Sequence, residues 1–177
     1  MIFFYLIFQL ISCGSSGSDG GIELVSEDTI ADYPLNEDRL TAVEFNNELT
    51  LMQEDAIQQI TVLFQSDTAS VQRNYENTLF ELEIYQSNIR EMQKEGLGED
   101  YLDEMQKLIA FYETELKTGF VEILPLLKKA NLTNEDLDRL EVYDKNFAAK
   151  EKAAFESVFQ AQEAFADTHN IKLQDHR

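Results

Sequence analysis

The sequence is poor in the residues that interrupt helices. Its 177 residues include only 2 prolines and 7 glycines, and four of those glycines lie within residues 14–21. Since proline and glycine are the residues least compatible with a helix interior, the rest of the chain favours long helices. The length suits one domain, and an apolar content of 44% is enough for a substantial core.

Positive charge is also scarce. The chain has 14 Lys and Arg side chains against 34 Asp and Glu, which gives a formal net charge of -20. Such a surface repels polyanions, so nucleic acid is excluded as a partner. No cluster of basic residues is present to attract anionic lipid headgroups. Any attachment to a membrane must therefore be apolar or covalent.

Histidine is limited to His169 and His176, near the C-terminus. A di-iron bundle needs Glu-x-x-His pairs on facing helices, which two such histidines cannot supply. A haem held by Met52 or Met105 opposite His169 is the other arrangement to weigh, but methionine on an apolar stripe is usually core filler. Neither histidine stands at a recognisable spacing from a nucleophile. We predict no catalytic residue, no cofactor and no enzymatic activity.

Other candidate sites have simpler structural explanations. The acidic clusters at residues 99–104 and 135–138 offer weak calcium binding, yet a calcium-loop spacing is missing and acids at helix starts already favour the helix dipole. We therefore predict no metal site. Four tyrosines are candidates for a groove that binds a peptide or small ligand, although such rings are more often buried with the hydroxyl at the rim. They are Tyr75, Tyr85, Tyr112 and Tyr143.

The only cysteine, Cys13, follows the most apolar stretch of the chain and has no intrachain disulfide partner. Residues 2–11 are too few to span a bilayer, which needs about 20 apolar residues. They do match the apolar core of a secretion signal, roughly 7–15 residues long. Ser12 supplies the small residue that signal processing requires before the cut.

The motif Leu10-Ile11-Ser12-Cys13 resembles the lipobox of bacterial lipoproteins. This resemblance covers about the first 13 residues and implies cleavage between Ser12 and Cys13, with a diacylglycerol group on the Cys13 thiol and often a further acyl chain on its amino group. Two or three acyl chains give stable anchoring. Because Gly14 and not Asp follows the cysteine, the resemblance favours the outer membrane over the inner. The alternative is an uncleaved anchor or an apolar segment docked on the domain.

Apolar residues recur at steps of three and four through the rest of the chain, which predicts helices over residues 36–65, 70–95, 99–127 and 134–168. Asn36 and Asp38 are candidate helix-start residues, as is Thr133 before the last helix. Gly96 and Gly98 are suited to ending the second helix. Pro125 predicts a kink or stop near residues 121–124, because proline removes a backbone donor.

Short links between long helices make neighbours antiparallel, so we predict an all-α, up-down-up-down four-helix bundle. The first turn, residues 66–69, has neither glycine nor proline. If it is helical, residues 36–95 form one rod and the alternative is an elongated three-helix coiled coil. The expected division is a signal peptide over residues 1–12, a lipidated cysteine with a flexible tether over 13–35, the bundle over 36–170 and a tail over 171–177.

These features predict a non-catalytic lipoprotein of the bacterial envelope. Its lipid would join Cys13 to the membrane, and its acidic bundle would contact a protein partner or a second copy, since seams of this kind often self-associate. The body of the chain resembles uncharacterised helical envelope lipoproteins in general character. The competing hypothesis is a carrier that holds a lipid, haem or metal between its helices.

Overall fold

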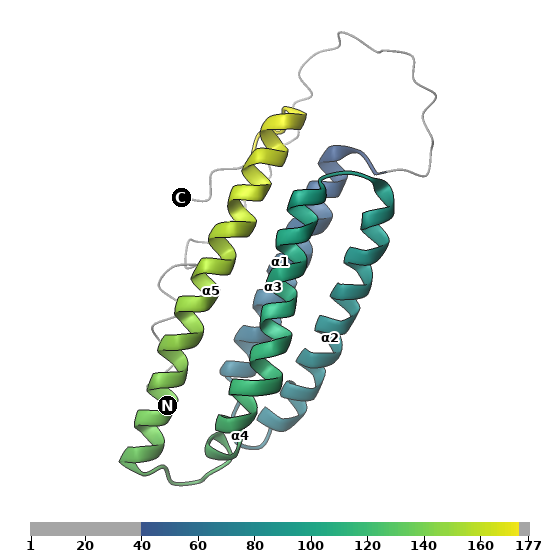
Figure 1. Cartoon of the computed structure of the whole chain (residues 1–177). Helices are drawn as coiled ribbons and strands as arrows, with labels where there is room; N and C mark the ends of the chain where they lie inside the picture. Colours follow the sequence, from purple (N-terminus) through teal and green to yellow (C-terminus); the bar gives the residue numbers. More distant parts are fainter. Residues whose placement is uncertain (1–39, 174–177) are drawn as a thin grey trace, which may run out of the picture.

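The computed structural model describes residues 40–173, and all regular structure in this part of the chain is helical (Figure 1). The all-α prediction is confirmed. Cys13, Ser12 and the expected signal and tether lie outside the described residues. The helices are α1 (Ala42–Phe64), α2 (Val71–Met92), α3 (Glu99–Glu115), α4 (Val121–Leu127) and α5 (Asn134–His169), with a 3-10 turn η3 (Gln93–Glu95) after α2 and a π turn η4 (Leu116–Phe120) between α3 and α4.

The helices run up, down, up and down, with α3, η4 and α4 forming one long segment (Figure 1). This arrangement confirms the four-helix bundle and excludes a continuous rod over residues 36–95. The first reversal needs no glycine because Asp67 builds it. One carboxylate oxygen of Asp67 accepts hydrogen bonds from the backbone N–H groups of Ala69, at 3.1 Å, and Ser70, at 2.8 Å. Such local bonds compete with helix continuation.

The start of α1 differs from the prediction. Thr41 is the cap of the helix, so Leu40 and Thr41 precede it and the predicted start at residue 36 is wrong. The Thr41 hydroxyl accepts from the Glu44 N–H at 3.2 Å, and the Glu44 carboxylate accepts from the Thr41 N–H at 2.8 Å. This reciprocal pair satisfies two free donors of the first turn. The candidate caps Asn36 and Asp38 lie outside the described residues.

The α2–α3 link confirms the prediction for its glycines. Gly96 and Gly98 have φ angles of 69° and 55°, in the left-handed region where a side chain is strained. At Gly98 a Cβ atom would also lie 2.8 Å from the ring of Phe45 and 2.9 Å from that of Phe165. Those two rings pack with their centroids 5.2 Å apart, and the Tyr101 ring lies 5.9 Å from that of Phe165. Aromatic packing thus closes this end of the bundle.

The irregularity expected at residues 121–124 occurs one turn earlier, as η4, and Pro125 lies inside α4. The apolar stripe explains the shift. Tyr112, Leu116 and Phe120 are separated by two successive steps of four, which an α-helix would rotate away from a single face. A π turn holds one more residue, so all three side chains remain buried at 0% exposure.

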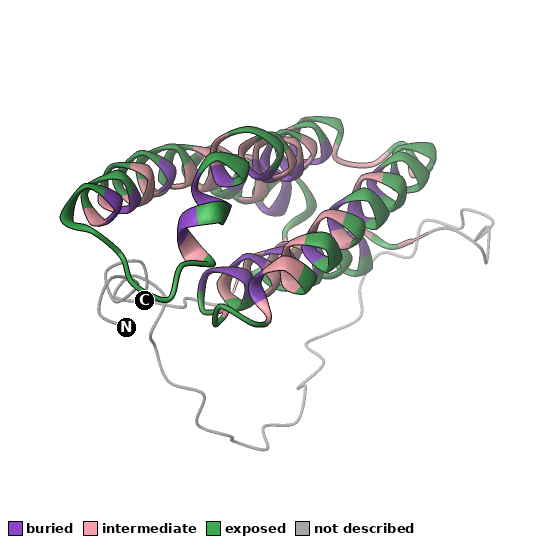
Figure 2. Cartoon of the chain, turned by 90° about the horizontal axis from the view of Figure 1, so that it is seen from below, coloured by how far each residue is buried: buried purple, intermediate pink, exposed green. Residues whose placement is uncertain are grey.

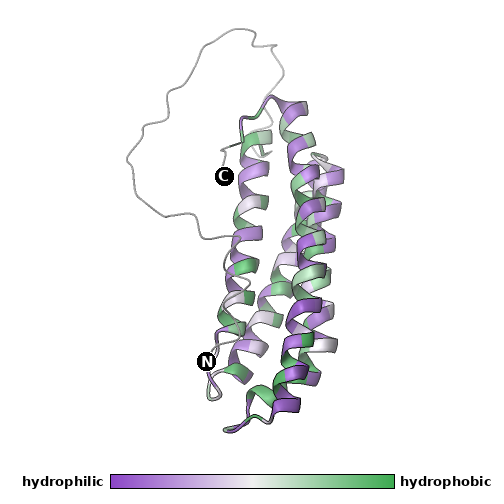
Figure 3. Ribbon diagram, turned by 90° about the vertical axis from the view of Figure 1, so that its left-hand side faces the viewer, coloured by the Kyte–Doolittle hydropathy of each residue, from purple (hydrophilic) through white to green (hydrophobic). Residues whose placement is uncertain are grey.

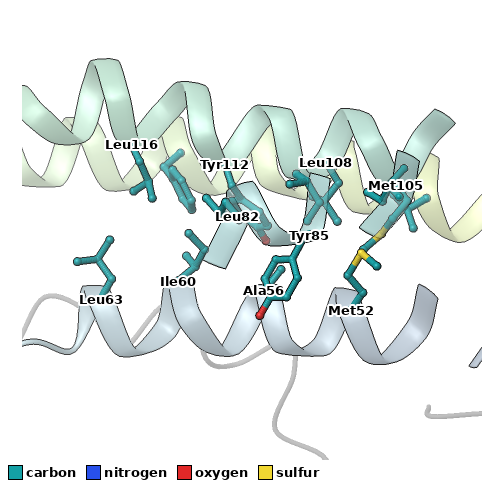
Figure 4. Packing of buried hydrophobic residues seen from close by; sticks show 14 of the residues in the cluster. Met52, Ala56, Ile60, Leu63, Leu82, Tyr85, Met105, Leu108, Tyr112 and Leu116 are labelled. Atoms are coloured by element: carbon teal, nitrogen blue, oxygen red, sulfur yellow. The ribbon is translucent and has the colours of Figure 1, made fainter. Parts of the chain in front are cut away.

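The core runs the length of the bundle between the helices (Figure 2). In Figure 4, four side chains of α1 point toward three of α3 and one of η4, with two of α2 among them. They are Met52, Ala56, Ile60 and Leu63 of α1, Met105, Leu108 and Tyr112 of α3, Leu116 of η4, and Leu82 and Tyr85 of α2. Polar residues alternate with apolar ones along each helix, so no helix in the described part of the chain is long and apolar enough to cross a bilayer (Figure 3).

Two separate parts of α5 contact α1, toward opposite ends of the bundle. Near one end, the Gln162 side-chain amide donates to Asn46, at 3.1 Å, and to Thr50, at 3.0 Å, beside the Phe45–Phe165 ring pair. Near the other, the Phe64 and Phe147 ring centroids are 5.0 Å apart. Residue 134 begins α5 at this second end, where η4 and α4 also lie (Figure 1). The second end contains the candidate site.

Candidate functional site

A surface cleft of about 410 Å³ lies between η4, α4 and α5. Apolar groups form a large part of its wall, including Ile123 and Val142, and the Val142 side chain is 59% exposed. Carboxylates and one guanidinium group add charge to the lining. The lining residues are Gly119, Glu122, Ile123, Glu135, Asp138, Arg139, Val142, Tyr143 and Asn146.

Tyr143 joins this cleft to the core. Its ring lies directly over Gly119, where a Cβ atom would come within 2.8 Å of the ring carbon Cε2. The ring also packs beside Phe147, Phe120 and Phe64, at centroid separations of 6.0, 6.3 and 6.4 Å. Glycine at position 119 therefore permits the approach of α5 to the π turn, and the ring separates the cleft from the interior.

The Tyr143 hydroxyl is buried and has no hydrogen-bond partner among the described residues. Burial raises the pKa of Tyr143, and the carboxylates of Glu115, Asp144 and Glu151 raise it further. The hydroxyl is consequently neutral at physiological pH and retains the capacity to donate a hydrogen bond. A buried polar group left unpaired is uncommon in a folded protein and is costly.

Two carboxylates of α5 lie in the same part of the bundle. Glu151 accepts a hydrogen bond of 2.8 Å from the hydroxyl of Tyr112, whose side chain is fully buried. Burial raises the pKa of Glu151 despite this bond, which acts to lower it, and Asp144 adds a repulsive charge. Burial also raises the pKa of Asp144, and its Oδ1 atom is without a partner in the described part of the chain. Both carboxyl groups therefore hold their protons more tightly than exposed carboxyls do.

The acidic side chains of the cleft are left free by the nearby lysines. Within residues 40–173, Glu122, Glu135 and Asp138 take part in no ion pair. Four of the lysines close to them in sequence are engaged with other carboxylates, in the pairs Lys117–Glu113, Lys129–Asp136, Lys145–Glu141 and Lys150–Glu115. A fifth, Lys128, donates to the side-chain oxygen of Gln72. Among the residues that line the cleft, Arg139 is the one with a basic side chain.

The interaction between Lys129 and Asp136 fixes the start of α5 beside the cleft. The Lys129 ammonium donates to both Asp136 oxygens, at 2.8 and 2.9 Å, while Asp136 also accepts from the Thr133 N–H at 3.0 Å. These bonds, with that of Lys129 first, lower the pKa of Asp136 to about 2. Thr133 completes the capping box, as its predicted role as a helix start requires.

The groups considered for haem binding differ in their exposure to solvent. Met52 and Met105 are core residues, with exposed fractions of 8% and 0%, whereas His169 is an exposed residue that packs on Phe165 at the end of α5. No group of three or more His, Cys, Asp or Glu side chains within residues 40–173 is arranged to hold a metal ion. Of the acidic clusters, residues 99–104 lie at the start of α3, and residues 135–138 supply two residues of the cleft.

Only one of the four candidate groove tyrosines lines the cleft. Tyr143 does so, whereas Tyr85 and Tyr112 are buried in the core and Tyr75 stacks on Phe120 with a centroid separation of 5.6 Å. Sequence reasoning missed Gly119, Asp144 and Glu151. A signal for the two acids was present, because positions 140, 144, 147, 151 and 154 follow alternating steps of four and three. Acidic residues thus occupy two positions of an otherwise apolar stripe.

Comparisons with known proteins return no match to a protein-family model, to a curated protein or to a solved structure.

Proposed function

We propose that this chain is a non-catalytic lipoprotein of the bacterial cell envelope that presents an acidic helical bundle to a protein partner. The observation that carries the proposal is the motif Leu10-Ile11-Ser12-Cys13, which places the only cysteine between an apolar segment and a run of glycine and serine. A lipid on Cys13 would attach the chain to the membrane, with the outer membrane favoured over the inner. Residues 14–21 would act as a flexible tether.

The bundle supports an interaction role more than a carrier role. Buried apolar side chains of α1, α2 and α3 face one another in the interior, which favours a packed core over a ligand cavity (Figure 4). The cleft between α4 and α5 lies at the surface instead, where its acidic lining is open to a macromolecule. The net charge of -20 makes a basic protein surface the favoured partner and a nucleic acid an unfavourable one.

Metabolic labelling tests the anchor. The full chain is expressed in a bacterial host supplied with a clickable fatty acid, beside Cys13→Ala and the tether variant Ser16→Ala. The parent chain and Ser16→Ala should carry label and sediment with the membranes, because the motif and its cysteine are intact. Cys13→Ala should lose the label and leave the membrane fraction. Absence of label on the parent chain, or label that persists in Cys13→Ala, would reject the lipoprotein proposal.

A further inference from the structure

We infer that the cleft between α4 and α5 docks a segment of a partner protein in which a lysine or arginine stands beside aliphatic side chains. This inference rests on the proposed interaction function and names the chemistry of the partner. The cleft volume of about 410 Å³ lies within the range of ordinary ligand sites, which is roughly 300–1,000 Å³. It is large enough for one long side chain and the aliphatic group next to it.

The apolar part of the wall determines the first half of the partner's chemistry. Ile123 and the ring of Tyr143 line the cleft, and Val142 is 59% exposed at its edge. Ile123 is only 5% exposed, so the apolar surface that a partner would cover belongs mainly to Val142. Removing such surface from water is the main favourable contribution to protein association. A purely polar segment would leave that contribution unused.

The charges determine the second half. Glu122, Glu135 and Asp138 line the cleft without an ion pair in the described part of the chain. Four neighbouring lysines are bound to other carboxylates, and Lys128 donates to Gln72. Arg139 offsets one of these three charges. A lysine or arginine can lay its methylene stem along apolar groups while its charged end reaches a carboxylate. The side chain therefore matches both the wall and the acidic lining.

A second copy of the chain fits the cleft less well. Each copy has a formal charge of -20, so two copies repel one another. Several lysines of the bundle are already engaged with its own carboxylates. A basic partner is not repelled by the negative charge of the bundle, and its lysines or arginines are available for the acids of the cleft. The favoured occupant is a different protein.

The test uses the full chain in mild detergent and fluorescent 12-residue peptides. The probe peptide combines lysine and leucine, a second peptide replaces leucine by serine, and a third replaces lysine by glutamate. We expect the lysine–leucine peptide to bind at least tenfold more tightly than either of the others. Equal binding of the lysine–serine peptide would show general attraction to a negative surface and would overturn the inference, as would no binding at all.

Matched variants locate the contact. The cleft variant, Glu135→Gln with Asp138→Asn, removes two acids from the cleft. The α3 variant, Glu99→Gln with Asp100→Asn, removes two acids from the start of α3, so the two variants have equal net charge. The cleft variant should weaken peptide binding at least tenfold, while the α3 variant should change it less than twofold. Equal weakening would reject the cleft as the site. Circular dichroism confirms that both variants remain helical.

Two further measurements separate the possible failures. Peptide binding by Cys13→Ala should equal that of the parent chain, so a failed labelling experiment with intact peptide binding rejects the anchor and leaves the cleft assignment standing. Sedimentation in matched detergent reports self-association. Dimers that disappear in the Glu135→Gln, Asp138→Asn variant would identify a second copy as the occupant and would overturn the assignment of a basic partner.

Discussion

Gly98 and Gly119 lie near opposite ends of the bundle, and each is packed against aromatic side chains. At Gly98 the backbone is left-handed and two rings approach, so both conformation and space require glycine. Gly119 lies within the π turn, and only the approach of Tyr143 requires it. The first end is closed by Phe45 and Phe165, whereas the second has a cleft. Each end contains a buried tyrosine hydroxyl without a hydrogen-bond partner in the described part of the chain, that of Tyr101 at the first and that of Tyr143 at the second. The difference teaches that a glycine packed against aromatic rings can close one end of the bundle and can lie beside an accessible cleft at the other.

The largest effect is expected for Gly98→Ala. A left-handed alanine costs about 1–2 kcal/mol, and the clash with two rings adds about 1–3 kcal/mol, so the free energy of unfolding should fall by about 3 kcal/mol. Urea denaturation measures this change. The control is Gly96→Ala, where φ is also positive but no atom lies within 4 Å of the added Cβ. It should lose about 1 kcal/mol. Equal losses would show that the rings are not responsible.

Gly119→Ala should have a smaller effect. Crowding of the Tyr143 ring costs about 1–3 kcal/mol, but alanine regains about 1 kcal/mol of helix propensity, so the net loss should be about 1 kcal/mol. The double variant with Tyr143→Leu tests the cause, because leucine lacks the ring atom that lies 2.8 Å from the added Cβ. The two substitutions should be less damaging together than the sum of their separate effects. Strict additivity would contradict the proposed contact.

Glu151→Gln should have the smallest effect, and it should be favourable at neutral pH. Glutamine keeps an oxygen that accepts from Tyr112 and removes a charge that burial disfavours. The raised pKa of Glu151 means that its ionisation costs stability as the pH rises through that pKa. The variant should therefore gain on the order of 1 kcal/mol or less at pH 7. This gain should vanish below the ordinary glutamate pKa of about 4.3.

Thermal unfolding across pH 3.5 to 7 measures the change, with about 2–4 °C of melting temperature expected per kcal/mol for a chain of this size. The control is Glu156→Gln, which changes an exposed carboxylate on the same helix. That variant should follow the parent chain at every pH. A stability gain in Glu151→Gln that is the same at pH 4 and pH 7 would show that ionisation of the buried carboxyl is not its source.

Much of the fold was predictable because it follows from periodicity and turn chemistry. The stripes of α2 and α5, the left-handed glycines at 96 and 98 and the cap at Thr133 were all predictable from local sequence. The start of α1 was not, because Thr41 competes with earlier cap candidates and a single sequence does not rank them. The π turn was missed because Pro125 is the more conspicuous signal. The informative signal was the spacing of Tyr112, Leu116 and Phe120 by two successive steps of four, which indicates an extra residue in the turn.

The candidate site was only partly predictable. Tyr143 and the acids at residues 135–138 were identified from the sequence, but as unconnected groups. The tyrosine was explained as a buried ring, and the acids as residues that favour the helix dipole. Their grouping depends on how closely α5 approaches η4, which is set by Gly119, and on where Lys129 and Lys145 direct their charges. These are tertiary relationships between segments that no local pattern specifies. The assignment of Cys13 remains a prediction, since it lies outside the described residues.

The π turn has a further consequence for the length of the chain. Residues Leu116–Phe120 contain one residue more than a regular helical turn needs to keep Tyr112 and Phe120 on the core face. Removing Thr118, which is exposed, would let this turn become an ordinary α-helix without rotating either flanking segment. The same deletion in the middle of α2 would turn half of its apolar face toward water. Insertions and deletions in related chains should therefore concentrate at this turn.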